Sequence, residues 1–145
     1  MKNLKIINFL TKGYILISGL AFLSVSLMAL ISPQAVMDLV QVQLSNPDAF
    51  SSIRGVYGGV GMALFISLIY LMFNNPNQAL VFLAMLWGFY AFSRIITIMV
   101  EGRLGSFGNQ WLFIEGILFL IAIGLYIASN KPNQEPVYLS KSLNA

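Results

Sequence analysis

The chain has 145 residues, of which 58% are hydrophobic and 9% charged, and its formal net charge is +3. A soluble domain carries about 25% charged residues, so this composition is typical of a membrane protein. The chain contains no Cys and no His, which excludes disulfides, Cys/His zinc sites, His-ligated haem and His-dependent nucleophilic catalysis. The basic residues do not cluster with polar or aromatic side chains, so we expect no nucleic-acid partner.

Apolar runs as long as the hydrocarbon core of a bilayer follow one another along the chain. They cover residues 13–31, 56–73, 78–100 and 111–128. The first run is too long for the apolar region of a signal peptide, so we expect an uncleaved helix. Because backbone groups find no water in lipid, each run is predicted to be a transmembrane helix. The fold class is therefore an all-α membrane protein with an antiparallel four-helix transmembrane bundle in residues 13–128.

The connections between these runs differ in length. Residues 74–77 predict a tight turn, and residues 101–110 predict a loop that contains glycine. In the longest connection, residues 32–55, Ser32-Pro33 is typical of a helix start, and an apolar stripe follows it. We expect a short helix there that lies at the membrane interface. Asn46-Pro47 repeats the start signal, which predicts that the second long helix begins near Pro47.

The lysines indicate how the chain is oriented in the membrane. They lie in the N-terminal segment 1–12 and in the polar tail 129–145. The connections on the opposite side carry acidic residues and arginines but no lysine. By the positive-inside rule, both terminal segments are predicted to be cytoplasmic.

Two charged residues lie inside the predicted spans. Arg94 is about 9 Å from the end of the third span, and Glu115 is about 6 Å from the start of the fourth, on the same side of the membrane. A lone charge at that depth costs at least about 2.5 kcal/mol. We therefore predict an ion pair between Arg94 and Glu115 inside the bundle.

The same depth on the non-cytoplasmic side holds further polar residues. A candidate polar pocket would be walled by Arg54, Tyr57, Tyr90, Arg94, Glu101 and Glu115. With Arg103 included, the local net charge is +1, which would suit an anionic lipid head group or a small acid. The alternative is that the Arg94–Glu115 pair only holds the helices in register.

Glycines in the second and fourth spans predict close helix packing, because small residues let helix backbones approach in lipid. These glycines are Gly55, Gly58, Gly59, Gly61, Gly116 and Gly124. The run 55–61 lies inside a span and lacks the lysine of a phosphate-binding loop, so packing is the favoured interpretation.

The run Arg54-Gly55-x-Tyr57-Gly58-Gly59-x-Gly61, followed by Arg94 and Glu115, resembles a family of small bacterial membrane proteins. This is domain-of-unknown-function family 4345, and the step Glu101-Gly102 fits the same pattern. The resemblance covers about residues 10–130 and implies a multi-pass protein of the bacterial inner membrane, without a known substrate. The layout is also similar to DoxX-like four-helix proteins, on architecture alone.

These observations favour a non-enzymatic protein: an accessory subunit, a scaffold, or a bundle that binds a lipid or a small anion. We expect no cofactor and no metal. The expected partners are the bilayer, an anionic lipid or small anion, and a second copy or another membrane protein. Two alternatives stay open. One is a small transporter or channel that uses Arg94 and Glu115, and the other is a membrane-embedded enzyme that uses Glu101 or Glu115 as its acid or base.

Overall fold

The computed structural model describes the backbone of residues 2–130 and the side chains of residues 4–130. Most of the predicted tail 129–145 therefore lies outside the described residues. The described chain is helical and contains no strand. Its elements are α1 (Lys2–Ile31), α2 (Pro33–Asp38), α3 (Pro47–Ile53), η1 (Arg54–Gly59), α4 (Val60–Asn74), α5 (Pro76–Val100) and α6 (Ser106–Ser129). The segment from α3 to α4 is one continuous helix with a π-helical turn, η1, in its middle.

Four helical segments of the described chain are long and apolar enough to cross a membrane, which confirms the predicted fold class. They are Leu4–Ile31, Pro47–Asn74, Pro76–Val100 and Ser106–Ser129. All are longer than the apolar runs in the sequence, because the helices continue into the polar residues that flank these runs. Helix α1 therefore includes the predicted N-terminal segment 1–12 from Lys2 onward, and the loop predicted for 101–110 ends at Gly105.

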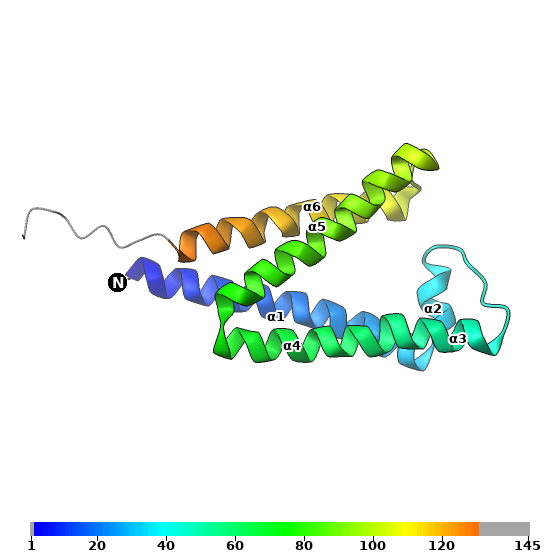
Figure 1. The fold of residues 1–145 in the computed structure, drawn as a ribbon, viewed down its shortest axis with the longest axis horizontal. Coiled ribbons are helices and arrows are strands. Elements are labelled where there is room, and N and C mark those ends of the chain that lie inside the picture. Colours follow the sequence, from blue (N-terminus) through cyan, green and yellow to red (C-terminus); the bar gives the residue numbers. More distant parts are fainter. Residues whose placement is uncertain (1, 131–145) are drawn as a thin grey trace, which may run out of the picture.

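The helices form two antiparallel pairs that meet at one end and diverge at the other (Figure 1). Helix α1 packs along α4 and η1, and α5 packs along α6. The pairs contact each other mainly through α1, which touches both α5 and α6. The ends that meet hold the start of α1, the turn at Asn75 and the end of α6, whereas α2 and the 101–105 loop lie at the open end (Figure 1).

The main hydrophobic core lies at the closed end, where all four long helices contribute side chains. Its buried members are Tyr14, Ile15, Leu68, Met72, Ala79, Leu80, Leu83, Trp87 and Ala122. A second, smaller cluster of Ala29, Val36 and Met37 holds α2 against the far end of α1. Since the two clusters are separate, the helix pairs are not packed together over their whole length.

The structure contains the two helix starts that the sequence predicts within residues 32–55, at the open end. Pro33 is the first residue of α2, although the Ser32 side chain makes no capping hydrogen bond. Pro47 is the first residue of α3, and the Asn46 side chain accepts a hydrogen bond from the Ala49 backbone N–H at 2.9 Å. After α2, the Gln34 side chain holds the following loop by hydrogen bonds to Val42 and Leu44.

The π-helical turn η1 lies where α1 and the α3–α4 segment approach closely. A π-turn widens the helix and leaves backbone carbonyls without their usual α-helical partners. Within this turn, the carbonyl oxygen of Gly58 accepts a hydrogen bond from the buried Ser26 hydroxyl of α1 at 2.6 Å. The turn therefore lies at a polar contact between two of the long helical segments.

Only two of the predicted packing glycines lie at this interface. A Cβ atom at Gly58 would lie 2.7 Å from the Leu30 side chain, and one at Gly61 would lie 3.0 Å from Ser26 Cβ and 3.4 Å from the Phe22 carbonyl oxygen. The other four predicted positions have no such neighbour: Gly55, Gly116 and Gly124 meet nothing within 4 Å, and Gly59 meets only the Arg54 carbonyl oxygen at 4.0 Å. The close contact between α1 and the α3–α4 segment therefore follows the Gly58/Gly61 face and not the Gly55/Gly59 spacing.

Replacing Gly61 by Leu should destabilise the protein, because the side chain would have to enter the contact between α4 and the backbone of α1. We expect a loss of about 1 to 3 kcal/mol, the usual cost of overpacking. Thermal unfolding in detergent would measure it, with Gly59→Leu as the matched control on the open face. Equal unfolding temperatures for the two variants would contradict this assignment of the interface.

Candidate functional site

The two charged residues inside the predicted spans form an ion pair. Arg94 of α5 donates hydrogen bonds from Nε to Glu115 Oε2 at 2.7 Å and from Nη2 to Glu115 Oε1 at 2.9 Å. The Glu115 side chain is 3% exposed and that of Arg94 is 23% exposed. Because the two side chains form a bidentate, mostly buried ion pair, both charges can lie inside an apolar helix bundle.

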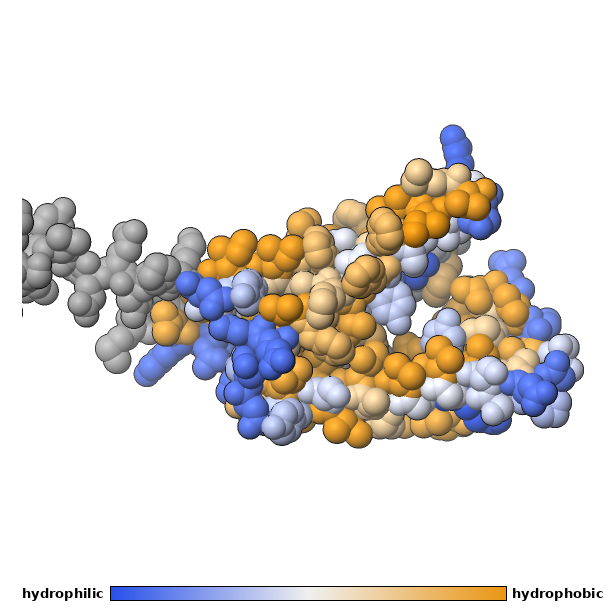
Figure 2. Space-filling model, viewed as in Figure 1, coloured by the Kyte–Doolittle hydropathy of each residue, from blue (hydrophilic) through white to orange (hydrophobic). Residues whose placement is uncertain are grey.

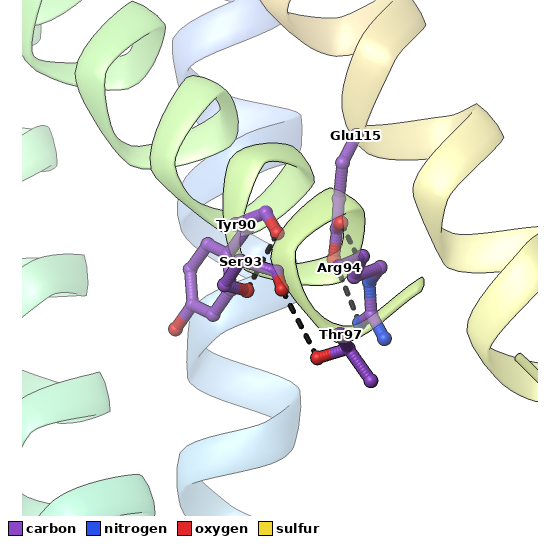
Figure 3. A network of polar contacts seen from close by, with 5 residues as sticks. All are labelled: Tyr90, Ser93, Arg94, Thr97 and Glu115. Atoms are coloured by element: carbon purple, nitrogen blue, oxygen red, sulfur yellow. Dashed lines mark hydrogen bonds and ion pairs between the residues drawn. The ribbon is translucent and has the colours of Figure 1, made fainter. Parts of the chain in front are cut away.

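The pair sits within a short stretch of polar contacts on α5 (Figure 3). The Ser93 hydroxyl donates to the Tyr90 carbonyl oxygen at 2.8 Å, and the Thr97 hydroxyl donates to the Ser93 carbonyl oxygen at 3.1 Å. These hydroxyls are satisfied by their own helix, as is usual for Ser and Thr in apolar surroundings. In the same view, the Tyr90 ring points away from the ion pair, toward the other pair of helices.

A cleft of about 360 Å³ opens between the diverging helix pairs, next to the ion pair. Figure 2 shows this hollow between the two arms of the molecule. Five elements contribute to its walls: Ala21, Phe22 and Val25 of α1; Val36, Met37 and Leu39 at α2, with Val40 after it; Tyr57 of η1; Trp87, Tyr90, Ser93 and Arg94 of α5; Phe107, Trp111 and Glu115 of α6. Most of this surface is apolar, and the polar groups are concentrated on α5, α6 and η1.

The cleft brings together four of the six residues that the sequence predicts for a polar pocket. Tyr57, Tyr90, Arg94 and Glu115 line it, whereas Arg54 and Glu101 do not. The Arg54 Nε donates to the Leu30 carbonyl oxygen at 3.2 Å, at the end of α1 where helix carbonyls lack partners. Glu101 follows the last turn of α5 and is exposed.

The predicted local charge of +1 is a sum over five residues, of which only two line this cleft. Arg54, Arg103 and Glu101 are outside its walls, and the charged residues that line it are Arg94 and Glu115. These two carry opposite charges and are joined by two hydrogen bonds. Within the described residues, the cleft has no net charge.

The sequence predicted Tyr57 and Tyr90 as walls of the pocket, but not the other four aromatic residues that line the cleft, Phe22, Trp87, Phe107 and Trp111. Phe22 and Trp87 stack with ring centroids 5.2 Å apart, Trp87 and Tyr90 are 6.3 Å apart, and Phe107 and Trp111 are 6.2 Å apart. The helical spacing of the tryptophans from the two charged residues is the sequence signal that could have placed them in the same cleft. Trp87 is seven residues before Arg94, and Trp111 is four residues before Glu115, so each shares a helix face with a charged residue.

The described part of the chain holds no group of three or more acidic or histidine side chains that could bind a metal ion. The polar side chains of the cleft instead come from arginine, glutamate, tyrosine and serine. Such groups can form hydrogen bonds with a bound organic molecule, and the apolar walls can cover its hydrocarbon part. The arrangement therefore has the composition of a small-molecule binding site.

One protein family matches this chain. The family described as "Domain of unknown function (DUF4345)" matches residues 10–128, which is most of the sequence. The matched range contains the ion pair, the cleft and most of each of the four long helical segments, since it begins within Leu4–Ile31 and ends one residue before Ser129. No curated protein and no solved structure matches the chain.

Replacing Glu115 by Leu should destabilise the fold, because Arg94 would lose its counter-charge inside the bundle. We expect a loss of at least about 2.5 kcal/mol in thermal unfolding measured in lipid nanodiscs. The double variant Arg94→Leu/Glu115→Leu removes both charges and should regain most of that stability. A double variant that is less stable than the single one would show that the charges act independently.

Proposed function

We propose that this chain, which belongs to the DUF4345 family, is a non-enzymatic membrane protein that binds a lipid-like molecule in the cleft beside the Arg94–Glu115 pair. The observation that carries the proposal is the open cleft itself, which lies between two helix pairs and has mostly apolar walls with a few converging polar groups. Known ligand sites have this composition, and they often lie between the helices of a bundle.

The geometry of Glu115 supports a binding role over catalysis. Both of its carboxylate oxygens accept hydrogen bonds from Arg94, and the residue is 2% exposed. A general acid or base has to come within hydrogen-bond distance of the substrate proton, and the nearly complete burial of Glu115 disfavours such a contact. In this arrangement, the carboxylate positions the guanidinium of Arg94, a residue that lines the cleft.

The packing below the cleft supports binding over transport. At the closed end of the bundle, Ile15, Leu68, Leu80 and Leu83 are fully buried in the core that joins all four long helices. A continuous polar path would have to pass through this apolar layer. The cleft is therefore best suited to hold a molecule that enters and leaves from one end or from the side.

The distribution of charged residues supports an orientation in the membrane, and the resemblance of the sequence to small bacterial membrane proteins supports a location. We place the protein in the bacterial inner membrane, with both termini in the cytoplasm and the cleft in the outer half of the bilayer. Lys5 and Lys12 lie at the closed end of the bundle, whereas Asp38, Asp48 and Arg103 lie in or beside the connections at the open end. The positive-inside rule supports this orientation.

A larger side chain in the cleft should abolish the binding of lipid without unfolding the protein. Trp87 and Trp111 are the two tryptophans of the chain, and both line the cleft, so their emission reports its occupancy. Phospholipids with brominated acyl chains should quench this emission in a saturable manner. We expect that Val25→Phe, which places a ring in the cleft, removes the saturable part, while Ile66→Phe on an exposed position of α4 leaves it intact.

Quenching that rises linearly with brominated lipid in the unaltered protein, with no saturable part, would contradict a binding cleft. Proteoliposomes provide the second readout, because ion or solute flux above that of empty vesicles would favour the transporter alternative. The Val25→Phe variant serves as the control for any such flux.

Single cysteines should report the orientation without background, because the chain has no native Cys. In intact bacterial cells, a membrane-impermeant maleimide should label Ser45→Cys and Asn109→Cys, which lie toward the open end. Labelling of Asn77→Cys, beside the turn at the closed end, should need cell lysis. The reverse pattern would invert the proposed topology.

A further inference from the structure

We infer that the cleft selects an uncharged amphiphile whose head is a flat ring with a carbonyl group, in preference to an anionic lipid. This inference rests on the proposed binding function and adds the chemical class of the ligand. Three properties of the cleft lead to it: its charge, its unused hydrogen-bond donors and its aromatic walls.

The charge of the cleft disfavours an anion. Glu115 lies within hydrogen-bond distance of Arg94, so an anion that approaches the guanidinium also approaches a carboxylate of the same sign. The anion would also lose its hydration in a cleft whose walls are mostly apolar. An uncharged head avoids both costs and can still accept hydrogen bonds from Arg94.

The polar groups of the cleft offer more donors than acceptors. A guanidinium has five N–H groups, and the contacts with Glu115 use one at Nε and one at Nη2. The remaining N–H groups of Arg94 and the hydroxyls of Tyr57 and Tyr90 make no hydrogen bond within residues 2–130. Since these donors line one cleft, a ligand that accepts hydrogen bonds, such as one with a carbonyl oxygen, satisfies them best.

The aromatic walls favour a flat ring over a flexible chain. Rings from α1, η1, α5 and α6 face the same space, namely Phe22, Tyr57, Trp87, Tyr90, Phe107 and Trp111. Aromatic side chains pack on unsaturated rings by offset stacking or edge-to-face contact. A volume of about 360 Å³ is at the small end of ligand sites, which fits one ring and the first part of a tail.

The cleft also provides a route for an apolar tail. Ala21, Leu39 and Val40 line the cleft, and each is exposed on the molecular surface. Their side chains are apolar, so a hydrocarbon tail can pass over them from the cleft to the surrounding acyl chains. The ring is then held beside Arg94, while the tail stays in the lipid.

Three matched probes test this inference in nanodiscs, with tryptophan emission or displacement of brominated lipid as the readout. They are methyl 4-octylbenzoate, its parent 4-octylbenzoate at about pH 9, where the carboxyl group is ionised, and methyl dodecanoate, which has the ester but no ring. For each probe, the affinity is given by its mole fraction in the bilayer at half-saturation, after subtraction of the signal from the Val25→Phe variant. We expect methyl 4-octylbenzoate to bind at least about tenfold more tightly than either of the other two probes, a difference of about 1.4 kcal/mol.

One variant isolates the hydrogen-bond part of the inference. Tyr90→Phe keeps the ring and removes the hydroxyl, so the affinity for methyl 4-octylbenzoate should fall about fivefold, the effect of one hydrogen bond. Tyr70→Phe is the matched control, because Tyr70 is exposed on α4 and does not line the cleft. An unchanged affinity in Tyr90→Phe would overturn the role of that donor.

The outcomes separate this inference from the proposed function. Equal or tighter binding of 4-octylbenzoate would overturn the selection for an uncharged head, and equal binding of methyl dodecanoate would overturn the selection for a ring. In both cases the lipid-binding function would stand. Failure of all three probes and of brominated phospholipid to give a saturable signal would remove both proposals.

Discussion

The buried ion pair between Arg94 and Glu115 is the constraint on which the arrangement of the second helix pair depends. An arginine inside an apolar helix has to find a counter-charge or a water-filled space. Glu115 supplies the counter-charge from the neighbouring helix, and the two hydrogen bonds fix both the distance and the relative rotation of α5 and α6. The faces that carry the pair also carry Trp87, Tyr90 and Trp111, so fixing the pair places these rings around one space.

The division of the hydrophobic contacts into two clusters explains why that space stays open. At the closed end, large apolar side chains from four helices fill the volume between the pairs. At the open end, the contacts of α1 are with α2 and η1, through Ala29, Val36 and the Ser26–Gly58 hydrogen bond. Among the described residues, this second cluster includes no side chain of α5 or α6, and a cleft lined by aromatic and polar side chains lies between the pairs.

Much of the fold could be predicted from the sequence, because long apolar runs in lipid permit few structures other than helices. The start at Pro47, the short helix after Ser32 and the Arg94–Glu115 contact all followed from local signals and from depth. The π-turn could not be predicted, since no local signal marks it and its Gly58 carbonyl contacts Ser26, which is far away in the sequence. Arg54 was placed in the pocket from its depth alone, but a carbonyl at the end of α1 competes for its side chain.

The joint between the two helix pairs has a mechanical consequence. Asn75 alone separates the last residue of α4 from the first residue of α5, and its side chain accepts a hydrogen bond from the backbone N–H of Gln78. A helix of the length of α5 is a lever of about 37 Å, so a tilt of about 5° at this joint moves its far end by about 3 Å. A small change of angle at this connection would therefore change the distance between the helix pairs at the open end, where the aromatic residues line the cleft.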